Sequence, residues 1–140
     1  MTIKFLIVDD DEASLKILTK NIDASALGQP TQIFWASTWP QALEISESEK
    51  PHLTFADACM KGRELQKTLD TILKMTRPII VTTGLSTDYT RPGQPMTFMA
   101  ECYVAGAEDY IVKGSERYDA IQDIALRTVL RKYASNNGPR

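Results

Sequence analysis

The chain is 140 residues long, 43% hydrophobic and 24% charged, with a formal net charge of −2. These values are typical of one globular domain, and they give no electrostatic reason to expect direct nucleic-acid binding. The first residues lack the regions of a signal peptide, and no apolar run approaches the ~20 residues that span a bilayer. Cys59 and Cys102 fit two reduced thiols better than a disulfide framework, so we expect a cytoplasmic protein without membrane contact.

The first half of the chain alternates between strand and helix patterns. Residues 3–8 are nearly continuously apolar and β-branched, as in a strand covered on both faces. The helix pattern after them has apolar positions at Leu15, Leu18 and Ile22. Residues 32–36 predict a second strand, and Ser37 or Thr38 is the candidate cap of the next helix. That helix has apolar positions at Ala42, Leu43 and Ile45.

The alternation continues through the second half. Further strands are predicted at 52–57, 78–84 and 109–113. The helices between and after them have apolar positions at Leu65, Leu69, Ile72 and Leu73, at Met96, Met99, Cys102 and Tyr103, and at Ile121, Ile124, Ala125 and Val129. A polar stretch, residues 85–95, precedes the fourth helix. Five strand–helix units predict a parallel sheet with helices on both faces, a doubly wound α/β domain.

Polar side chains end four of the five predicted strands. They are, in chain order, Asp9 and Asp10, then Asp57, then Thr82 and Thr83, and finally Lys113. The carboxyl ends of parallel strands form the functional crevice of such folds, so we expect these side chains to meet. Carboxylates with open positions suit Mg²⁺, and a hydroxyl with an ammonium suits phosphoryl oxygens.

The acidic run from Asp9 to Glu12 needs a reason, because like charges repel. Two carboxylates ~4 Å apart repel by about 4 kcal/mol at an effective dielectric near 20. Lys113 can offset one such repulsion, and a divalent cation would relieve the rest. We interpret Asp9 and Asp10 as part of a metal site, and Asp11 and Glu12 as residues of the first helical turn, where the macrodipole favours them.

Four segments together resemble a known family. They are "LIVDDDE" at the first strand, "PHLTFADACMKG" around the third, "PIIVTTG" at the fourth and "GAEDYIVKG" at the fifth. In this order they resemble the receiver domain of bacterial two-component response regulators over nearly the whole chain. The resemblance implies a flavodoxin-like, CheY-like (βα)5 domain at 1–133 and a tail at 134–140, with no output domain. The chain is then either a stand-alone receiver or a piece of a longer regulator.

The resemblance implies a phosphorylation and metal site. Asp57 would be the phosphoacceptor, attacking phosphorus as a nucleophile to give an acyl phosphate. Mg²⁺ would be held by Asp10, Asp57 and the backbone carbonyl of Cys59, with Asp9 on a metal-bound water. On this basis the protein is not an enzyme but a phosphoacceptor signalling domain, which assists only its own phosphorylation and dephosphorylation.

The resemblance also implies a switch. Lys113 and Thr83 would contact the phosphoryl group, and Thr83 with Tyr110 would change an interaction surface. The donor would be a histidine kinase or a phosphotransfer protein, and the receiver of the signal a downstream protein target. The protein would be a monomer or a phosphorylation-dependent dimer.

Two positions depart from the family. Lys61 and Gly114 stand where proline is usual, and the family's Lys-Pro bond is typically cis. Because a non-proline cis bond costs ~2.5–4 kcal/mol, we expect a trans Lys113–Gly114 bond, with Gly114 supplying unusual dihedrals. The 85–95 stretch makes the connection before the fifth strand longer than usual and is expected to bear on partner choice.

Two other functions remain open. The first is a receiver fold that serves as a phosphorylation-independent interaction module. The second is a phosphohydrolase of the haloacid dehalogenase type, whose nucleophile follows the first strand as D-x-D-x-[TV]. Asp9 and Asp11 supply D-x-D, but Ala13 stands where Thr or Val belongs.

Three conspicuous side chains are given structural roles. Trp35 and Trp39 are expected to serve in packing. His52 precedes the third strand, where receivers commonly carry an acidic residue, and it is expected to lie at the surface.

Overall fold

A single sheet of five parallel strands forms the centre of the molecule. The computed structural model describes residues 1–61 and 64–137. The strand order is β2-β1-β3-β4-β5. The strands are β1 (Ile3–Val8), β2 (Thr31–Ala36), β3 (Leu53–Asp57), β4 (Ile79–Thr83) and β5 (Asp109–Val112). The predicted doubly wound (βα)5 fold is therefore confirmed.

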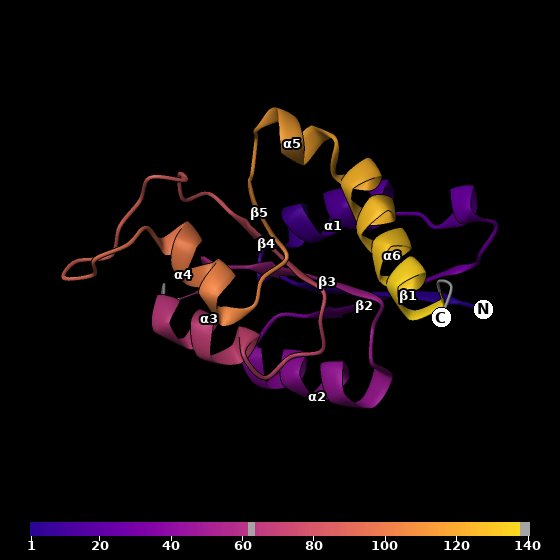
Figure 1. Ribbon diagram of the computed structural model, residues 1–140, viewed down its shortest axis with the longest axis horizontal. Helices are drawn as coiled ribbons and strands as arrows, with labels where there is room; N and C mark the ends of the chain where they lie inside the picture. The colour runs from indigo at the N-terminus through magenta and orange to yellow at the C-terminus, as the bar shows by residue number, and fades with distance from the viewer. Residues whose placement is uncertain (62–63, 138–140) are drawn as a thin grey trace.

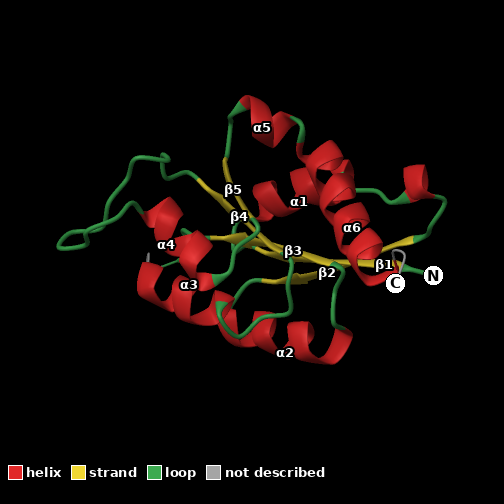
Figure 2. Cartoon of the chain, viewed as in Figure 1, coloured by secondary structure: helices red, strands yellow, loops and turns green. Residues whose placement is uncertain are grey.

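Helices cover both faces of this sheet (Figures 1 and 2). One face carries α2 (Trp39–Glu49), α3 (Leu65–Ile72) and α4 (Phe98–Ala105). The other carries α1 (Glu12–Asn21), the short α5 (Glu116–Asp119) and α6 (Ile121–Asn137), while a 3-10 turn, η1 (Ser25–Leu27), lies in the connection to β2. None of the helices in the described residues has both the length and the apolar composition needed to cross a membrane.

The two faces of the sheet pack into separate cores. Phe5 and Phe55 belong to the core under α1 and α6. Leu6 and Val81 belong to the core over α2, α3 and α4. β3 and β4 are buried along their whole length, as expected of central strands that helices cover on both faces. In β2, by contrast, only Ala36 is buried.

Short polar side chains cap most of the helices. Asp11 is the N-cap of α1 and accepts a hydrogen bond from the Ser14 N–H, while Glu12 begins the helix. This confirms the predicted helical role of both acidic residues. Thr38, one of the two predicted candidates, caps α2 by accepting from the Gln41 N–H. Each cap satisfies an N–H group that the first helical turn leaves without a partner.

The predicted buried faces of two helices are partly wrong. Met96 precedes α4, because Thr97 caps that helix and Phe98 begins it. The buried residues of α4 are Phe98, Cys102 and Ala105, and Tyr103 is exposed. α4 is apolar almost all round, so its sequence could not show which face is inside. In the third helix Leu73 is the C-cap and is exposed instead of buried.

The conspicuous side chains have mixed outcomes. Trp39 is buried, which agrees with its predicted packing role, whereas Trp35 is 61% exposed, so most of its side chain is not packed. β2 is a terminal strand, and few neighbours cover its side chains. His52 is only half-buried, and its Nδ1 accepts a hydrogen bond from the Lys4 N–H at 2.9 Å.

The last helix extends beyond the predicted domain end at residue 133. α6 continues to Asn137, so the first four residues of the predicted tail, 134–137, are helical. The remaining residues of that tail, 138–140, lie outside the described residues.

Candidate functional site

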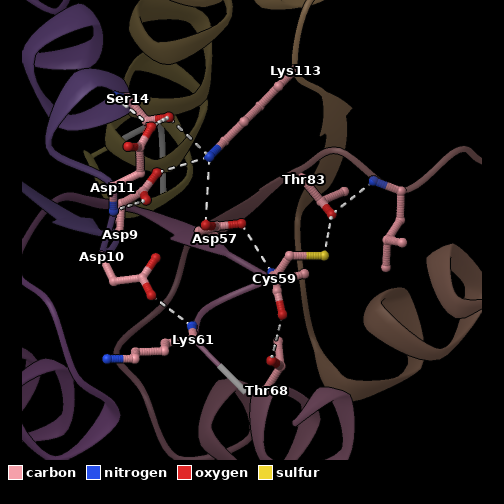
Figure 3. Close-up of polar contacts among 12 residues, drawn as sticks. Asp9, Asp10, Asp11, Ser14, Asp57, Cys59, Lys61, Thr68, Thr83 and Lys113 are labelled. Atoms are coloured by element: carbon pink, nitrogen blue, oxygen red, sulfur yellow. Dashed lines mark hydrogen bonds and ion pairs between the residues drawn. The ribbon is translucent and has the colours of Figure 1, made fainter. Parts of the chain in front are cut away.

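Three carboxylates converge at the carboxyl edge of the sheet (Figure 3). Asp57 ends β3, and Asp9 and Asp10 follow β1. Asp9 and Asp57 are buried, while Asp10 is exposed. One oxygen of each carboxylate lies within 4.8 Å of an oxygen of the other two. Three converging carboxylate oxygens, open to solvent on one side, fit a hard divalent cation such as Mg²⁺, which keeps several of its waters.

A backbone N–H group orients each of the three carboxylates. Each accepts one such hydrogen bond and keeps lone pairs for another partner. The bonds are Asp11 N to Asp9 Oδ1 (2.9 Å), Lys61 N to Asp10 Oδ2 (2.6 Å) and Cys59 N to Asp57 Oδ1 (2.9 Å). Sequence reasoning missed the Lys61 contact. A proline at position 61 would have no N–H to donate, so this bond depends on the departure from the family pattern.

Lys113 reaches into the acidic cluster from the end of β5 (Figure 3). Its Nζ lies 2.9 Å from Asp9 Oδ2 and 3.5 Å from Asp57 Oδ2. Gly114 follows with φ +82°, a left-handed conformation suited to glycine. The only cis peptide bond in the described part of the chain is Arg77–Pro78, so the predicted trans Lys113–Gly114 bond is confirmed.

Ser14 is a further member of the site that sequence reasoning missed. Lys113 Nζ donates to Ser14 Oγ at 3.2 Å. Ser14 Oγ in turn donates to Asp11 Oδ2 at 2.8 Å. The sequence signal was the spacing of a capping Asp11 three residues before a hydroxyl, which places Ser14 in the first turn of α1 beside the crevice.

Burial and charge shift the pKa values of the site in opposite directions. Burial raises the pKa of Asp57 to about 6, against the lowering effects of the Cys59 N–H and of Lys113. Burial lowers the pKa of Lys113, but Asp9 and Asp57 outweigh it, so this pKa lies above its ordinary value. The site therefore favours extra positive charge, because one ammonium faces three carboxylates.

Thr83 and Tyr110 meet at the backbone of Leu85. Thr83 is buried, and its Oγ1 accepts from the Leu85 N–H at 3.1 Å and lies 3.4 Å from the Cys59 thiol. Tyr110 donates its hydroxyl proton to the Leu85 carbonyl oxygen at 3.1 Å. Its ring is buried against Phe98 in an edge-to-face contact, with 6.4 Å between centroids. The two predicted switch residues thus share one contact at the start of the β4–α4 connection.

The long β4–α4 connection is held against α4 by a backbone hydrogen bond and an ion pair. The Tyr89 carbonyl oxygen accepts from the Phe98 N–H at 2.8 Å. Arg91 forms a two-bond ion pair with Glu101, in which Nε lies 2.9 Å from Oε1. Both side chains of this pair are largely buried, at 16% and 10% exposure. The segment projects from the body of the molecule (Figure 2), but its base is held at these two places.

The fold and the site together define a doubly wound domain with an acidic crevice that a lysine enters. The sequence matches the family model described as the response regulator receiver domain over residues 5–125. The chain therefore belongs to the response regulator receiver domain family. A search of curated proteins found no match.

Solved structures show the same fold. The signal receiver domain of a putative Luxo repressor protein from Vibrio parahaemolyticus is 23% identical, with TM-score 0.70 and 100% coverage of both chains. The response regulator domain of Thermotoga maritima CheB is 23% identical, with TM-score 0.68, 99% coverage of this chain and 100% of that one. A CheY-like receiver domain protein from Methanospirillum hungatei JF-1 is also 23% identical, with TM-score 0.66 and coverages of 95% and 98%.

Proposed function

We propose that the chain is a cytoplasmic protein that accepts a phosphoryl group on Asp57 from a histidine kinase or phosphotransfer protein and passes the signal to a downstream protein target. The observation that carries this proposal is the environment of the Asp57 side chain. Its carboxylate is buried, with Oδ2 3.5 Å from the Lys113 ammonium and two further carboxylates alongside. Phosphoryl transfer depends mainly on alignment and charge neutralisation, and this arrangement offers both.

In the proposed reaction an oxygen of Asp57 forms a bond to phosphorus as the bond from phosphorus to the donor breaks. Lys113 neutralises charge on the phosphoryl oxygens. Asp10, Asp57 and the Cys59 carbonyl would hold Mg²⁺, with Asp9 on a metal-bound water. When bound, the cation supplies charge neutralisation at the transferring group.

The proposed switch begins at Thr83. A phosphoryl group on Asp57 would add about −1.5 to −2 charges and three acceptor oxygens. The Thr83 hydroxyl would donate to one of them and leave the Cys59 thiol, from which it lies 3.4 Å. Because Leu85 bonds to both Thr83 and Tyr110, a shift of Thr83 changes the contact that holds the Tyr110 hydroxyl.

Beryllofluoride, which mimics a phosphoryl group, and acetyl phosphate test this proposal. We expect wild type with Mg²⁺ to bind beryllofluoride and to gain the mass of one phosphoryl group from acetyl phosphate. Asp57→Asn should lose both responses. Asp70→Asn is the matched control, because Asp70 is an exposed carboxylate on α3 away from the crevice, and it should behave as wild type. The proposal would be overturned if wild type showed no response, or if Asp57→Asn responded as wild type does.

One observation favours the interaction-module alternative. The Lys61 N–H bonds to Asp10 Oδ2 at 2.6 Å, so this carboxylate has a partner in the absence of a cation. If Mg²⁺ does not raise the melting temperature, this alternative is preferred. The phosphohydrolase alternative has less support, because its motif needs Thr or Val where Ala13 stands.

A further inference from the structure

The outer edge of β2 lacks the features that usually protect a sheet edge. β2 is a terminal strand of the sheet and pairs with β1 alone within the described residues. Its sequence, TQIFWA, contains no charged residue, proline or glycine, and its register with β1 is regular from Thr31 to Ala36. Natural proteins usually blunt such an edge with charges, prolines or bulges, because it otherwise pairs with another strand.

The backbone bonds show which groups of β2 point away from the sheet. The Ile3 N–H donates to the Pro30 carbonyl and the Asp9 N–H donates to the Ala36 carbonyl, so even-numbered residues bond to β1. In a parallel pair every second residue of a strand bonds to a given neighbour. The residues whose N–H and C=O groups point outward are therefore Thr31, Ile33 and Trp35.

A groove lies beside this edge, on the α1 face of the sheet. It has a volume of about 420 Å³ and is lined by Ile33 and Trp35 of β2 and by Leu15, Lys16 and Lys20 among the residues of α1. Trp35 is 61% exposed, an unusual position for so large an apolar side chain. The outward backbone groups and the groove thus belong to the same residues of β2.

We propose that the β2 edge pairs antiparallel with β2 of a second copy of this chain, around a twofold axis perpendicular to the sheet. Such an axis keeps the α1 faces of both copies on the same side of the joined sheet. It also sets the outward N–H and C=O groups of one β2 strand opposite those of the other. Centred on Phe34, the pairing sets Trp35 of each copy opposite Ile33 of the other. Aromatic and β-branched residues form favourable cross-strand pairs, and the partner's Trp35 then lies at the mouth of the groove.

The charges beside the groove suit a second copy. α1 returns antiparallel to β1, so Glu12 lies towards the carboxyl end of the sheet and Lys20 towards its amino end. The twofold axis reverses this order in the partner and sets the acidic end of one groove opposite the basic end of the other. The uncharged β2 edge adds no repulsion between the copies.

Sedimentation velocity over a concentration series tests the proposal on the full chain. We expect wild type to show a concentration-dependent equilibrium between monomer and dimer, because a short strand pair makes a small interface. Trp35→Lys should weaken dimerisation roughly tenfold or more, because it removes the central aromatic side chain and adds a charge to each edge. Val104→Lys makes the same charge change at an exposed apolar residue of α4 and should dimerise as wild type.

Amide hydrogen exchange gives a second, residue-specific measurement. The N–H groups of Ile33 and Trp35 should become protected only at dimer-forming concentrations. The Phe34 N–H, which the alternation assigns to β1, should be protected at every concentration. A wild type that stays monomeric throughout the series would overturn the proposal. A dimer that survives Trp35→Lys, or that Val104→Lys disrupts instead, would also overturn it.

Discussion

Lys113 is held in the crevice by three oxygen acceptors, which belong to Asp9, Ser14 and Asp57. An ammonium has three N–H donors, so a phosphoryl group near Asp57 could take one bond without displacing the other two. The Ser14 hydroxyl proton is directed to Asp11, which leaves the Ser14 lone pairs for Lys113. Ser14 thereby helps to aim the third N–H of Lys113 towards Asp57.

Ser14→Ala tests this positioning role. We expect the affinity for beryllofluoride with Mg²⁺ to fall by roughly tenfold or more, because a hydrogen bond to the charged Lys113, of about 1.5–3 kcal/mol, is lost. Ser14→Thr keeps a hydroxyl and should restore most of the affinity. Fluorescence titration gives both values. If Ser14→Ala binds as tightly as wild type, Ser14 contributes only to the start of α1.

The raised pKa of Asp57 predicts a pH-dependent stability of the metal-free protein. Because this pKa is about 6 in the folded chain and 3.8 is its ordinary value, folding favours the protonated form. Asp57 therefore contributes stability that is complete below about pH 4 and lost as the pH rises through 6.

Asp57→Asn isolates this contribution, since asparagine stays neutral. In EDTA at pH 7.5 we expect the variant to be more stable than wild type by about 1–3 kcal/mol in urea unfolding. The difference should vanish near pH 4. A variant less stable than wild type at pH 7.5 would mean that the pairing of Asp57 with Lys113 outweighs its burial.

The core of the candidate site could be predicted from single residues, and its periphery could not. Asp9, Asp57 and Lys113 end parallel strands, and such ends always meet at one edge of a sheet. The Ser14 contact depends on how α1 is rotated, and the Lys61 contact depends on the backbone path of a loop. Neither property is visible in residue type or spacing.

At the scale of elements, the β4–α4 connection is the main addition to the fold. Its ion pair joins Arg91, in the connection, to Glu101, on the first turn of α4. Both charges are largely removed from water, so each depends on the other for compensation. The pair therefore fixes the connection that also carries Leu85, the contact of Thr83 and Tyr110.

Glu101→Gln should destabilise the protein by about 1.5–3 kcal/mol, because it leaves the Arg91 charge without its partner. Arg91→Met should have a similar cost. The double variant should cost less than the sum of the two single changes, since no charge is left unpaired. Urea unfolding of all four proteins measures this coupling. Additive costs would show that the pair contributes nothing as a pair.

The elements differ in how well the sequence predicts them. Strands β1 and β4 are covered on both faces, so their apolar runs stand out from the segments around them. The prediction of the start and buried face of α4 was partly wrong. The helix is apolar on nearly every side, and its start at Phe98 depends on a cap at Thr97. The extension of α6 to Asn137 crosses polar residues that carry no periodic signal.

At the scale of the whole molecule, alternation of strands and helices was enough to predict the fold, because few topologies bury five parallel strands. The same alternation does not show how much of a terminal strand is covered. Trp35 was expected to serve in packing because it is large and apolar, whereas the order of the strands leaves it at the surface.

Mg²⁺ should stabilise the whole domain, because a ligand that binds only the folded state raises its free energy of unfolding. At a concentration a hundredfold above its dissociation constant the gain is about 2.7 kcal/mol, or roughly 5–10 °C in melting temperature. Asp10→Asn should lose this gain. Asp11→Asn should keep it, because Asp11 caps α1 and asparagine is an equally good cap. Equal losses in both variants would contradict the assignment of Asp10 to the metal site and of Asp11 to the start of α1.

The outer tip of the β4–α4 connection offers a place to attach a reporter. The Arg91 carbonyl accepts from the Gln94 N–H at 3.1 Å, so the chain reverses within four residues, with Pro92 and a left-handed Gly93 in the middle. The two ends of this turn are close, and lengthening a closed loop costs little free energy. A dye-binding tag inserted between Pro92 and Gly93 would leave the Arg91–Glu101 pair in place and carry a fluorescent signal beside α4, where movements of that helix could be followed in living cells.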